Sequence, residues 1–233
     1  MTKTTLQSGE YLWDDASMSR MGRYLTSRAL GFINRSLPAH LKGSLLDLGC
    51  GTGKLSRPMA SRGFDVISLE YDHVPLALFR QRDPQAQLVQ ADAQYLPFKD
   101  ESFDVILAVE MLDYLPDRPR FYTEAWRTLK PGGLMLATLT NRRSIKGALY
   151  EAYLRKQRRE RIRRYYEMNL EQGLTEIRKA GFEIGPAWGY NWNILPRNTN
   201  SRLVELCSSV ERLFKLENIP SLSPLVFVVV RKP

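Results

Sequence analysis

The chain has 233 residues, a formal net charge of +9, 43% hydrophobic residues and 25% charged residues. This composition is typical of one globular domain with a sizeable core, and no apolar run approaches the roughly 18 residues of a membrane span. Two cysteines and two histidines without metal-binding spacing argue against a disulfide framework or a metal site. The start of the chain lacks a signal-peptide apolar region, so we expect a cytoplasmic protein.

The first predicted element is an amphipathic helix that begins near Met18 and ends near Pro38. Apolar residues recur along it at helical spacing, with arginines between them, so this stripe is expected to pack in the core. The stripe consists of Met18, Met21, Leu25, Ala29, Phe32 and Ile33.

A turn with glycine at every second position follows the first predicted strand. Gly49, Gly51 and Gly53 remove side chains from one side of the turn, so a ligand can approach its backbone closely. Asp47 adds a carboxylate, and a helix predicted over residues 54–62 is expected to direct unpaired N–H groups to the same place. This combination suits a zwitterion better than a polyphosphate.

Two other glycine loops do not fit this turn. A dinucleotide fingerprint needs a third glycine where Lys54 stands, and a phosphate-binding P-loop needs serine or threonine where Leu55 stands. A plain tight turn without a ligand is the remaining alternative.

Strands and helices alternate along the rest of the chain. The predicted strands cover residues 44–48, 65–69, 87–90, 103–109, 134–139, 182–188 and 225–230. The predicted helices after the glycine turn cover residues 54–62, 74–81, 118–129, a stretch that begins after Asn169, and 202–216. The alternation between 44 and 139 indicates an α/β fold with a parallel, doubly wound sheet.

Acidic residues stand where several of these strands end. Glu70 lies just under 20 positions past the glycine turn, near the place where dinucleotide folds put the acid that holds a ribose. A carboxylate accepts both hydroxyls of a diol well. The alternatives are a simple strand-end acid for Glu70, a helix N-cap or competing ribose ligand for Asp72, and a turn residue for Asp92. Glu110 ends the fourth strand, so all these acids should share one rim of the sheet.

Four segments together resemble the class I S-adenosylmethionine-dependent methyltransferases, of the small-molecule type. The glycine turn has the form D-x-G-x-G-x-G, Ala91-Asp92-Ala93 precedes L-P-F and S-F-D-V-I, and L-K-P-G-G-x-L precedes the fifth strand. The resemblance implies a Rossmann-like, three-layer αβα fold with strand order 3-2-1-4-5-7-6 and an antiparallel last strand. It also implies that residues 130–133 form a sharp reversal.

The resemblance further implies that S-adenosylmethionine is the cofactor and which residues bind it. Asp92 would accept a hydrogen bond from the adenine amino group, and the backbone N–H of Ala93 would bond the ring. The cofactor-binding residues implied at matching positions are Asp47, Gly49, Cys50, Gly51, Gly53, Glu70, Tyr71, Asp92, Ala93 and Glu110. Residues of about 1–40 would cap the cofactor, with Tyr11, Trp13 and Arg20 as candidates.

The reaction implied is an in-line methyl transfer to an acceptor, with a general base needed only for some acceptors. Asp113, Tyr114, Tyr165 and Tyr166 are the candidate bases, although the family often has histidine at one of the first two positions. The sequence after the fourth strand lacks the motifs for methylating base amines, cytosine C5 or protein arginine. A small-molecule or lipid-like acceptor is therefore favoured.

Residues 141–168 carry many more basic than acidic residues and form an insertion in a single domain that spans residues 1–233. The insertion is either a solvated helix or a clamp for an anionic substrate or a membrane surface. Two alternatives stay open: a methyltransferase that docks RNA or a carrier-bound or protein substrate there, and a non-catalytic S-adenosylmethionine-binding protein.

Overall fold

A computed structural model describes residues 16, 18–149, 152 and 168–233. All seven predicted strands are present; β5 begins five residues earlier than predicted, and the other ends differ by no more than two residues. The strands are β1 (Ser44–Leu48), β2 (Asp65–Glu70), β3 (Gln87–Gln90), β4 (Phe103–Ala108), β5 (Leu129–Thr140), β6 (Glu183–Tyr190) and β7 (Leu225–Arg231). The helices are α2 (Arg20–Ser36), α3 (Ser56–Ser61), α4 (His73–Arg82), α5 (Arg118–Thr128), α7 (Leu170–Lys179), α8 (Leu203–Leu213) and the 3-10 turns η1 (Leu112–Tyr114), η3 (Leu216–Asn218) and η4 (Pro220–Leu222).

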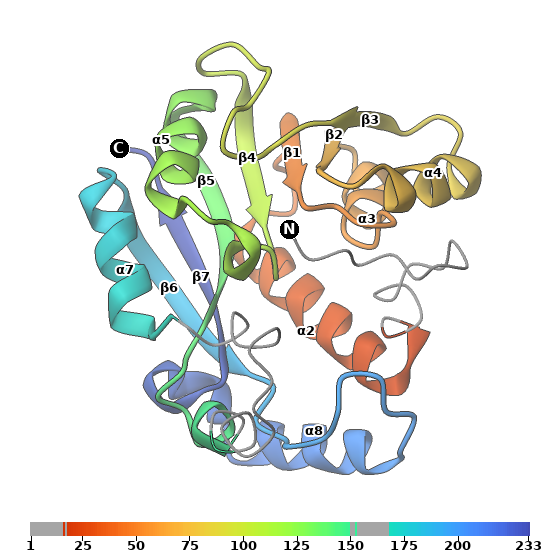
Figure 1. Cartoon of the computed structure of the whole chain (residues 1–233), viewed down its shortest axis with the longest axis vertical. Coiled ribbons are helices and arrows are strands. Elements are labelled where there is room, and N and C mark those ends of the chain that lie inside the picture. The colour runs from red at the N-terminus through yellow and green to blue at the C-terminus, as the bar shows by residue number, and fades with distance from the viewer. Residues whose placement is uncertain (1–15, 17, 150–151, 153–167) are drawn as a thin grey trace.

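The seven strands form one sheet in the order β3-β2-β1-β4-β5-β7-β6, which confirms the predicted topology. β1 to β5 run parallel, and β7 is antiparallel to both β5 and β6. Helices lie on both sides of this twisted sheet, so the fold is a Rossmann-like αβα sandwich (Figure 1). Because β1 and β4 are neighbours, the crevice at the carboxyl ends of these strands is the switch point where such sheets bind ligands.

Each face of the sheet has its own apolar core. Leu46 and Ile106 pack with α5 and α7 on one face, whereas Leu45 and Leu107 pack with α2 on the other. Successive residues of β1 and β4 therefore serve opposite cores, as the period of a strand requires. This burial on both faces explains why these strands are nearly continuous apolar runs.

Two predicted elements differ from the structure. The helix after the glycine turn begins only at Ser56, because residues 51–55 form turns instead. The predicted sharp reversal at residues 130–133 is wrong. These residues belong to β5 and bulge out opposite Asp104, with Gly132 at φ 75°. Gly132 still donates its N–H to the carbonyl of Lys232, 2.8 Å away, so the bulge stays attached to the sheet.

Candidate functional site

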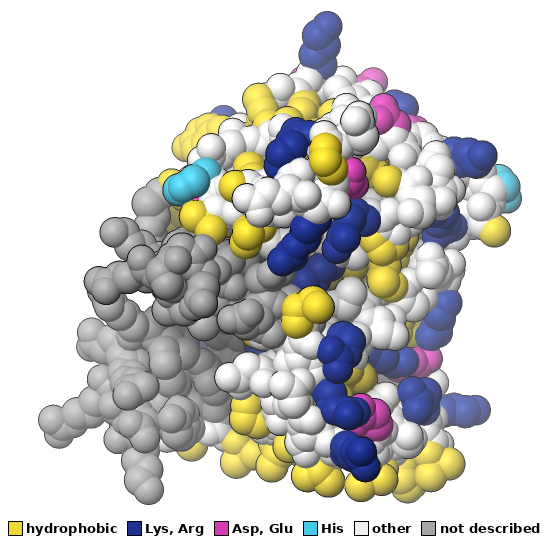
Figure 2. Space-filling model, turned by 90° about the vertical axis from the view of Figure 1, so that its right-hand side faces the viewer, with side chains coloured by type: hydrophobic (Ala, Val, Ile, Leu, Met, Phe, Trp, Pro, Cys, Tyr) yellow, Lys and Arg dark blue, Asp and Glu magenta, His cyan; other side chains and the backbone are white. Residues whose placement is uncertain are grey.

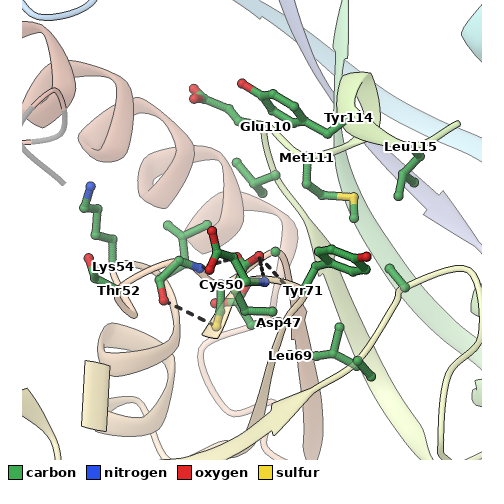
Figure 3. Close-up of a pocket in the computed structure, with 18 of the residues that line it drawn as sticks. Asp47, Cys50, Thr52, Lys54, Leu69, Tyr71, Glu110, Met111, Tyr114 and Leu115 are labelled. Carbon is green, nitrogen blue, oxygen red and sulfur yellow. Dashed lines mark hydrogen bonds between the residues drawn. The ribbon is translucent and has the colours of Figure 1, made fainter. Parts of the chain in front are cut away.

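A cavity of about 1050 Å³ opens at the carboxyl ends of β1 to β4. Ligand sites usually enclose about 300–1,000 Å³, so this cavity lies at the upper end of that range. The predicted site residues that line it are Asp47, Gly49, Cys50, Gly51, Glu70, Tyr71, Asp92, Ala93, Glu110 and Tyr114. Four separate strands therefore bring the predicted acids together around one space (Figure 3).

Several other candidates do not line the cavity. Gly53 and Asp113 lie outside its wall. Arg20 also lies outside it, and its guanidinium pairs with the carboxylate of Glu205. The remaining candidates, Tyr11, Trp13, Tyr165 and Tyr166, lie outside the described residues, as does most of the basic insertion.

The glycine turn shapes the floor of the cavity. Gly49, Gly51 and Gly53 all have positive φ, at 67°, 54° and 80°, which favours glycine at each position. A Cβ at Gly53 would lie 2.1 Å from the ring of Phe79, and one at Gly49 would lie 2.8 Å from the Cβ of Met111. Glycine at these two positions is thus required by packing inside the protein as well as by the turn.

The first N–H groups of the glycine turn are bonded inside the protein. The N–H groups of Gly49 and Cys50 both donate to the carbonyl of Leu69, at 2.9 and 3.1 Å. The N–H of Gly51 donates to the carboxylate of Glu70, 3.0 Å away. The glycine turn therefore gives a ligand room to approach the backbone. Polar contacts with the ligand would come from the neighbouring carboxylates.

Asp47 is a buried carboxylate at the end of β1, and only 2% of it is exposed. The hydroxyl of Ser56 donates to it at 2.5 Å. The pKa of Asp47 is raised to about 7, mainly by burial and also by the nearby Glu70 carboxylate, against the lowering effect of the bond from Ser56. A cationic ligand group beside Asp47 would offset this cost of burying a charge.

Glu70 ends β2 and connects the glycine turn to the rest of the rim. Its carboxylate accepts the N–H groups of Gly51, Tyr71 and Asp72, at 3.0, 2.8 and 3.3 Å. Burial raises the pKa of Glu70, and these three bonds lower it. Because a carboxylate has about four acceptor positions, one is left for a ligand hydroxyl, and a second hydroxyl would replace the longest of these bonds, the one from Asp72.

Asp92 follows β3 and is held in place by Gln94. The side-chain amide of Gln94 donates to both oxygens of Asp92 at 3.0 Å, and its backbone N–H donates to one of them at 2.9 Å. The carbonyl oxygen of the Gln94 side chain accepts the N–H of Asp117 at 2.8 Å. Gln94, which sequence reasoning missed, therefore orients the carboxylate that faces the cavity.

The end of the cavity away from Asp47 is lined by a different group of residues. Figure 3 shows Glu110, Met111, Tyr114 and Leu115 together on one side, apart from Asp47 and Cys50 on the other. Glu110 has φ 57°, an uncommon value for a residue other than glycine that often marks a functional site. Its carboxylate lies 2.9 Å from Nη2 of Arg197, which reaches the cavity from the loop between β6 and α8.

Two partly buried ionisable groups interact electrostatically with Arg197. Lys146 donates to the Asn191 side chain at 2.9 Å, and its pKa is lowered to about 8 by burial and, to a smaller extent, by the charge of Arg197. Burial raises the pKa of Asp113 to about 7, although Thr140 donates to it at 2.7 Å and the charge of Arg197 opposes the rise. The polar groups around Arg197 are therefore electrostatically coupled.

Comparisons with known proteins agree with this geometry. A family model described as a methyltransferase domain matches residues 46–137, which include β1 to β4 and most of β5. A ubiquinone biosynthesis O-methyltransferase of Acinetobacter baylyi is 26% identical over 199 residues, which cover 80% of this chain and 82% of that protein. A probable S-adenosylmethionine-dependent methyltransferase of Mycobacterium tuberculosis is 32% identical over 108 residues, or 46% of this chain, and the match spans only 39% of its length.

The fold also matches solved structures. A Thermotoga maritima S-adenosylmethionine-dependent methyltransferase, described as a possible histamine N-methyltransferase, superimposes with a TM-score of 0.62. The match covers 91% of both chains at 22% identity, so it concerns the fold. The chain belongs to the class I S-adenosylmethionine-dependent methyltransferases. S-adenosylmethionine is accordingly its cofactor.

The residues of this methyltransferase cavity fit that cofactor. The cofactor carries an ammonium group, ribose hydroxyls and an adenine amino group, which are all hydrogen-bond donors. Asp47, Glu70 and Asp92 offer three carboxylates along one wall, and Ser56 donates a hydrogen bond to the buried Asp47 carboxylate. Donors on the cofactor and acceptors on the protein therefore match in kind.

The wall of the cavity also includes residues that sequence reasoning missed. Arg197 comes from the loop before α8, and α2 contributes Gly22, Leu25 and Thr26. The small residues Gly22 and Thr26 on the buried side of α2 were the one sequence feature that could have indicated that this helix lines the cavity. No local motif marks Arg197, because a loop brings it to the cavity only in the folded protein.

Proposed function

We propose that this protein transfers a methyl group from S-adenosylmethionine to a lipophilic small molecule that binds beside Glu110, Tyr114 and Arg197. The observation that carries the proposal is the division of one cavity into two parts. One part presents the carboxylates of Asp47, Glu70 and Asp92, and the other presents apolar side chains with few polar groups.

In the first part, each carboxylate would hold a different portion of the cofactor. Asp47 would pair with the ammonium group, Glu70 would accept the ribose hydroxyls, and Asp92 would accept the adenine amino group. Gly49 and Gly51 would allow close approach of the cofactor to the turn, and Ala93 would contact the ring. When bound, the cofactor supplies an electrophilic methyl group on its sulfonium.

In the second part, Val109, Met111 and Leu115 form an apolar wall that suits a lipophilic acceptor. Such a wall excludes water and holds the acceptor in one orientation, which is the main contribution a protein makes to this kind of transfer. Tyr114 and Arg197 are the polar groups on the same side that can orient a hydroxyl or carboxylate of the acceptor. The name of the Acinetobacter relative, an O-methyltransferase of ubiquinone biosynthesis, supports an acceptor of this kind.

The candidate bases differ in access to the acceptor. Tyr114 lines the cavity, whereas Asp113 is turned to Thr140 and does not. We therefore assign Tyr114 as the group that contacts the acceptor, and Asp113 as a positioning residue for η1, through its bond to Thr140 of β5. An acceptor whose nucleophilic group loses its proton readily would need no further base.

The proposal is tested by incubating the purified chain with methyl-labelled S-adenosylmethionine and a cell extract, and then separating organic-soluble, aqueous, RNA and protein fractions. The expected result is label in an organic-soluble small molecule. Asp92→Asn, which keeps the shape of the side chain, should reduce labelling at least about tenfold, because one charge-assisted hydrogen bond is lost. Label confined to RNA or protein, or no label in any fraction while the cofactor binds, would contradict the proposal.

A further inference from the structure

Helix α8 presents its apolar residues to the outside of the molecule. A surface helix normally buries its apolar stripe and exposes its polar side. Here Ser208 and Glu211 are buried, whereas Leu206, Leu213 and Phe214 are 60%, 77% and 65% exposed. The exposed apolar face of α8 and of the residue after it consists of Leu203, Leu206, Val210, Leu213 and Phe214.

Contacts on the buried side fix this orientation. The carboxylate of Glu211 accepts the N–H of Trp192 at 3.0 Å and the hydroxyl of Tyr24, which comes from α2. Val204, on the same side of α8, packs into the core beneath it. Turning α8 to bury its leucines would carry the Glu211 carboxylate out to solvent and take this acceptor away from the N–H of Trp192 and the hydroxyl of Tyr24.

The apolar face continues beyond the helix. Ile219 and Leu222, in the 3-10 turns that follow α8, are 40% and 55% exposed. Figure 2 shows hydrophobic side chains along the lower edge of the molecule, where α8 lies in Figure 1. Single exposed apolar residues are common on proteins, but a continuous row of them indicates a surface that is covered by a partner.

Basic residues border this face. Helix α2, which packs beside α8, has four arginines and no acidic residue. Arg202, Arg212 and Lys215 are exposed on α8 and at its two ends. The nearby acids Glu205 and Glu217 pair with three of the α2 arginines, so the excess positive charge comes from the fourth, Arg23, together with the three exposed basic residues of α8 and its ends. The border is therefore positive, in keeping with the net charge of +9 of the whole chain.

We propose that the exposed apolar face of α8 docks onto an anionic lipid bilayer, with the helix lying in the plane of the membrane surface. Leucine and phenylalanine on one side with arginine and lysine at the border are the features of helices that bind at the lipid headgroup level. Anionic headgroups complement the positive border. A symmetric dimer through the same face would instead bring two positive borders together, which disfavours a second copy as the partner.

The position of α8 connects docking with the cavity. The loop that carries Arg197 into the cavity wall leads directly into α8, and α2 contributes to the same wall. A bilayer bound at α8 would lie near the acceptor end, from which a lipophilic molecule could enter. This last link rests on the proposed function, whereas docking itself requires neither cofactor nor acceptor.

Docking is tested by sedimentation of the full chain with vesicles of phosphatidylcholine, with and without phosphatidylglycerol. The variant is Leu206→Gln/Leu213→Gln/Phe214→Gln, which removes three apolar side chains without changing the net charge. The matched control is Tyr95→Gln, which removes an exposed aromatic residue that follows β3, outside the α8 face. Circular dichroism and cofactor affinity should be unchanged in both, because all four side chains are exposed and none lines the cavity.

The expected result is binding to anionic vesicles that weakens at least about tenfold in the triple variant and not in the control. Raising the salt from about 0.1 M to about 0.5 M should weaken binding of the unmodified chain, because salt screens the headgroup charges. The proposal is overturned if the unmodified chain does not bind anionic vesicles, or if the triple variant binds as well. A dimer that the triple variant abolishes, without vesicle binding, would identify a second copy as the partner instead.

Discussion

The two ends of the cavity differ in how the chain builds them. The cofactor end uses residues at the tips of β1, β2 and β3, all within residues 47–94, and backbone hydrogen bonds tie them together. The acceptor end combines Tyr114 with Arg197 and α2, whose positions in the sequence are far apart. Local motifs can therefore preserve a cofactor site while distant loops change the acceptor. If this view is right, a substitution at one end should change cofactor affinity or methyl transfer without an equal change in the other quantity.

The largest effect is expected from Asp47→Asn at the cofactor end. Loss of the buried carboxylate should weaken S-adenosylmethionine binding by about 100-fold at pH 8, because a desolvated ion pair is worth about 2–3 kcal/mol. Isothermal titration calorimetry measures this change. An affinity within threefold of the unmodified protein would show that Asp47 does not bind the ammonium group.

The same variant should make the protein without cofactor more stable. A rise in the pKa of Asp47 from 3.8 to about 7 corresponds to about 4 kcal/mol of unfavourable charge burial at high pH. Loss of the hydrogen bond from Ser56 offsets part of this, so we expect a gain of roughly 2 kcal/mol in the free energy of unfolding at pH 8. Denaturant titration at pH 8 checks it, and a loss of stability would contradict the account.

A smaller effect of a different kind is expected from Arg197→Ala at the acceptor end. Methyl transfer should fall by about 30-fold, because an orienting charged group is removed. Cofactor affinity should stay within about twofold, since the cofactor end is unchanged. Turnover of the organic-soluble acceptor and calorimetry measure the two quantities, with Arg197→Lys as the matched control that keeps the charge. Equal losses in both quantities would show that the two ends are not separate.

The affinity for the cofactor should fall about tenfold between pH 8 and pH 6. Asp47, with a pKa raised to about 7, must lose its proton to pair with an ammonium group, so affinity falls as pH drops below 7. The effect of Asp47 on the free energy of unfolding has the opposite pH dependence. Its raised pKa adds stability at low pH, and this stability is lost as the pH rises through 7. Asp47→Asn should remove the pH dependence of binding, and a profile unchanged by this variant would assign it to another group.

The smallest effect is expected from Gln94→Ala. Asp92 would keep its charge but lose the side-chain bonds that orient it, so cofactor affinity should fall by about three- to fivefold. Calorimetry measures the loss. Gln94→Glu would place a like charge beside Asp92 and should weaken binding more than Gln94→Ala does. The reverse order would show that Gln94 does not act through Asp92.

The difference between the two ends also explains which features the sequence could predict. Gly49, Glu70 and Asp92 follow strands whose apolar pattern is plain, and a parallel sheet must bring such strand ends to one edge. The apolar patterns also predicted the seven strands, whereas their order was implied by the resemblance to the methyltransferase family. Arg197 and Lys146 could not, because their positions depend on how a loop and a helix end pack against the sheet.

The sequence also could not predict that the apolar face of α8 points outward. The period of its apolar residues predicts a helix, but period alone does not say whether the stripe faces the core or the outside. The bonds of Glu211 to Trp192 and Tyr24 decide the orientation, and they join three distant segments. Most of the basic insertion, residues 141–168, lies outside the described residues, so its assignment as a clamp stays a prediction.

The most direct test of the central claim is calorimetric titration of S-adenosylmethionine into the purified chain and into Asp92→Asn at pH 8. The account predicts one molecule bound per chain, with affinity reduced at least about tenfold in the variant, because acidic side chains at the strand ends hold the cofactor. Absence of binding to the unmodified chain, or equal affinity for both proteins, would contradict it.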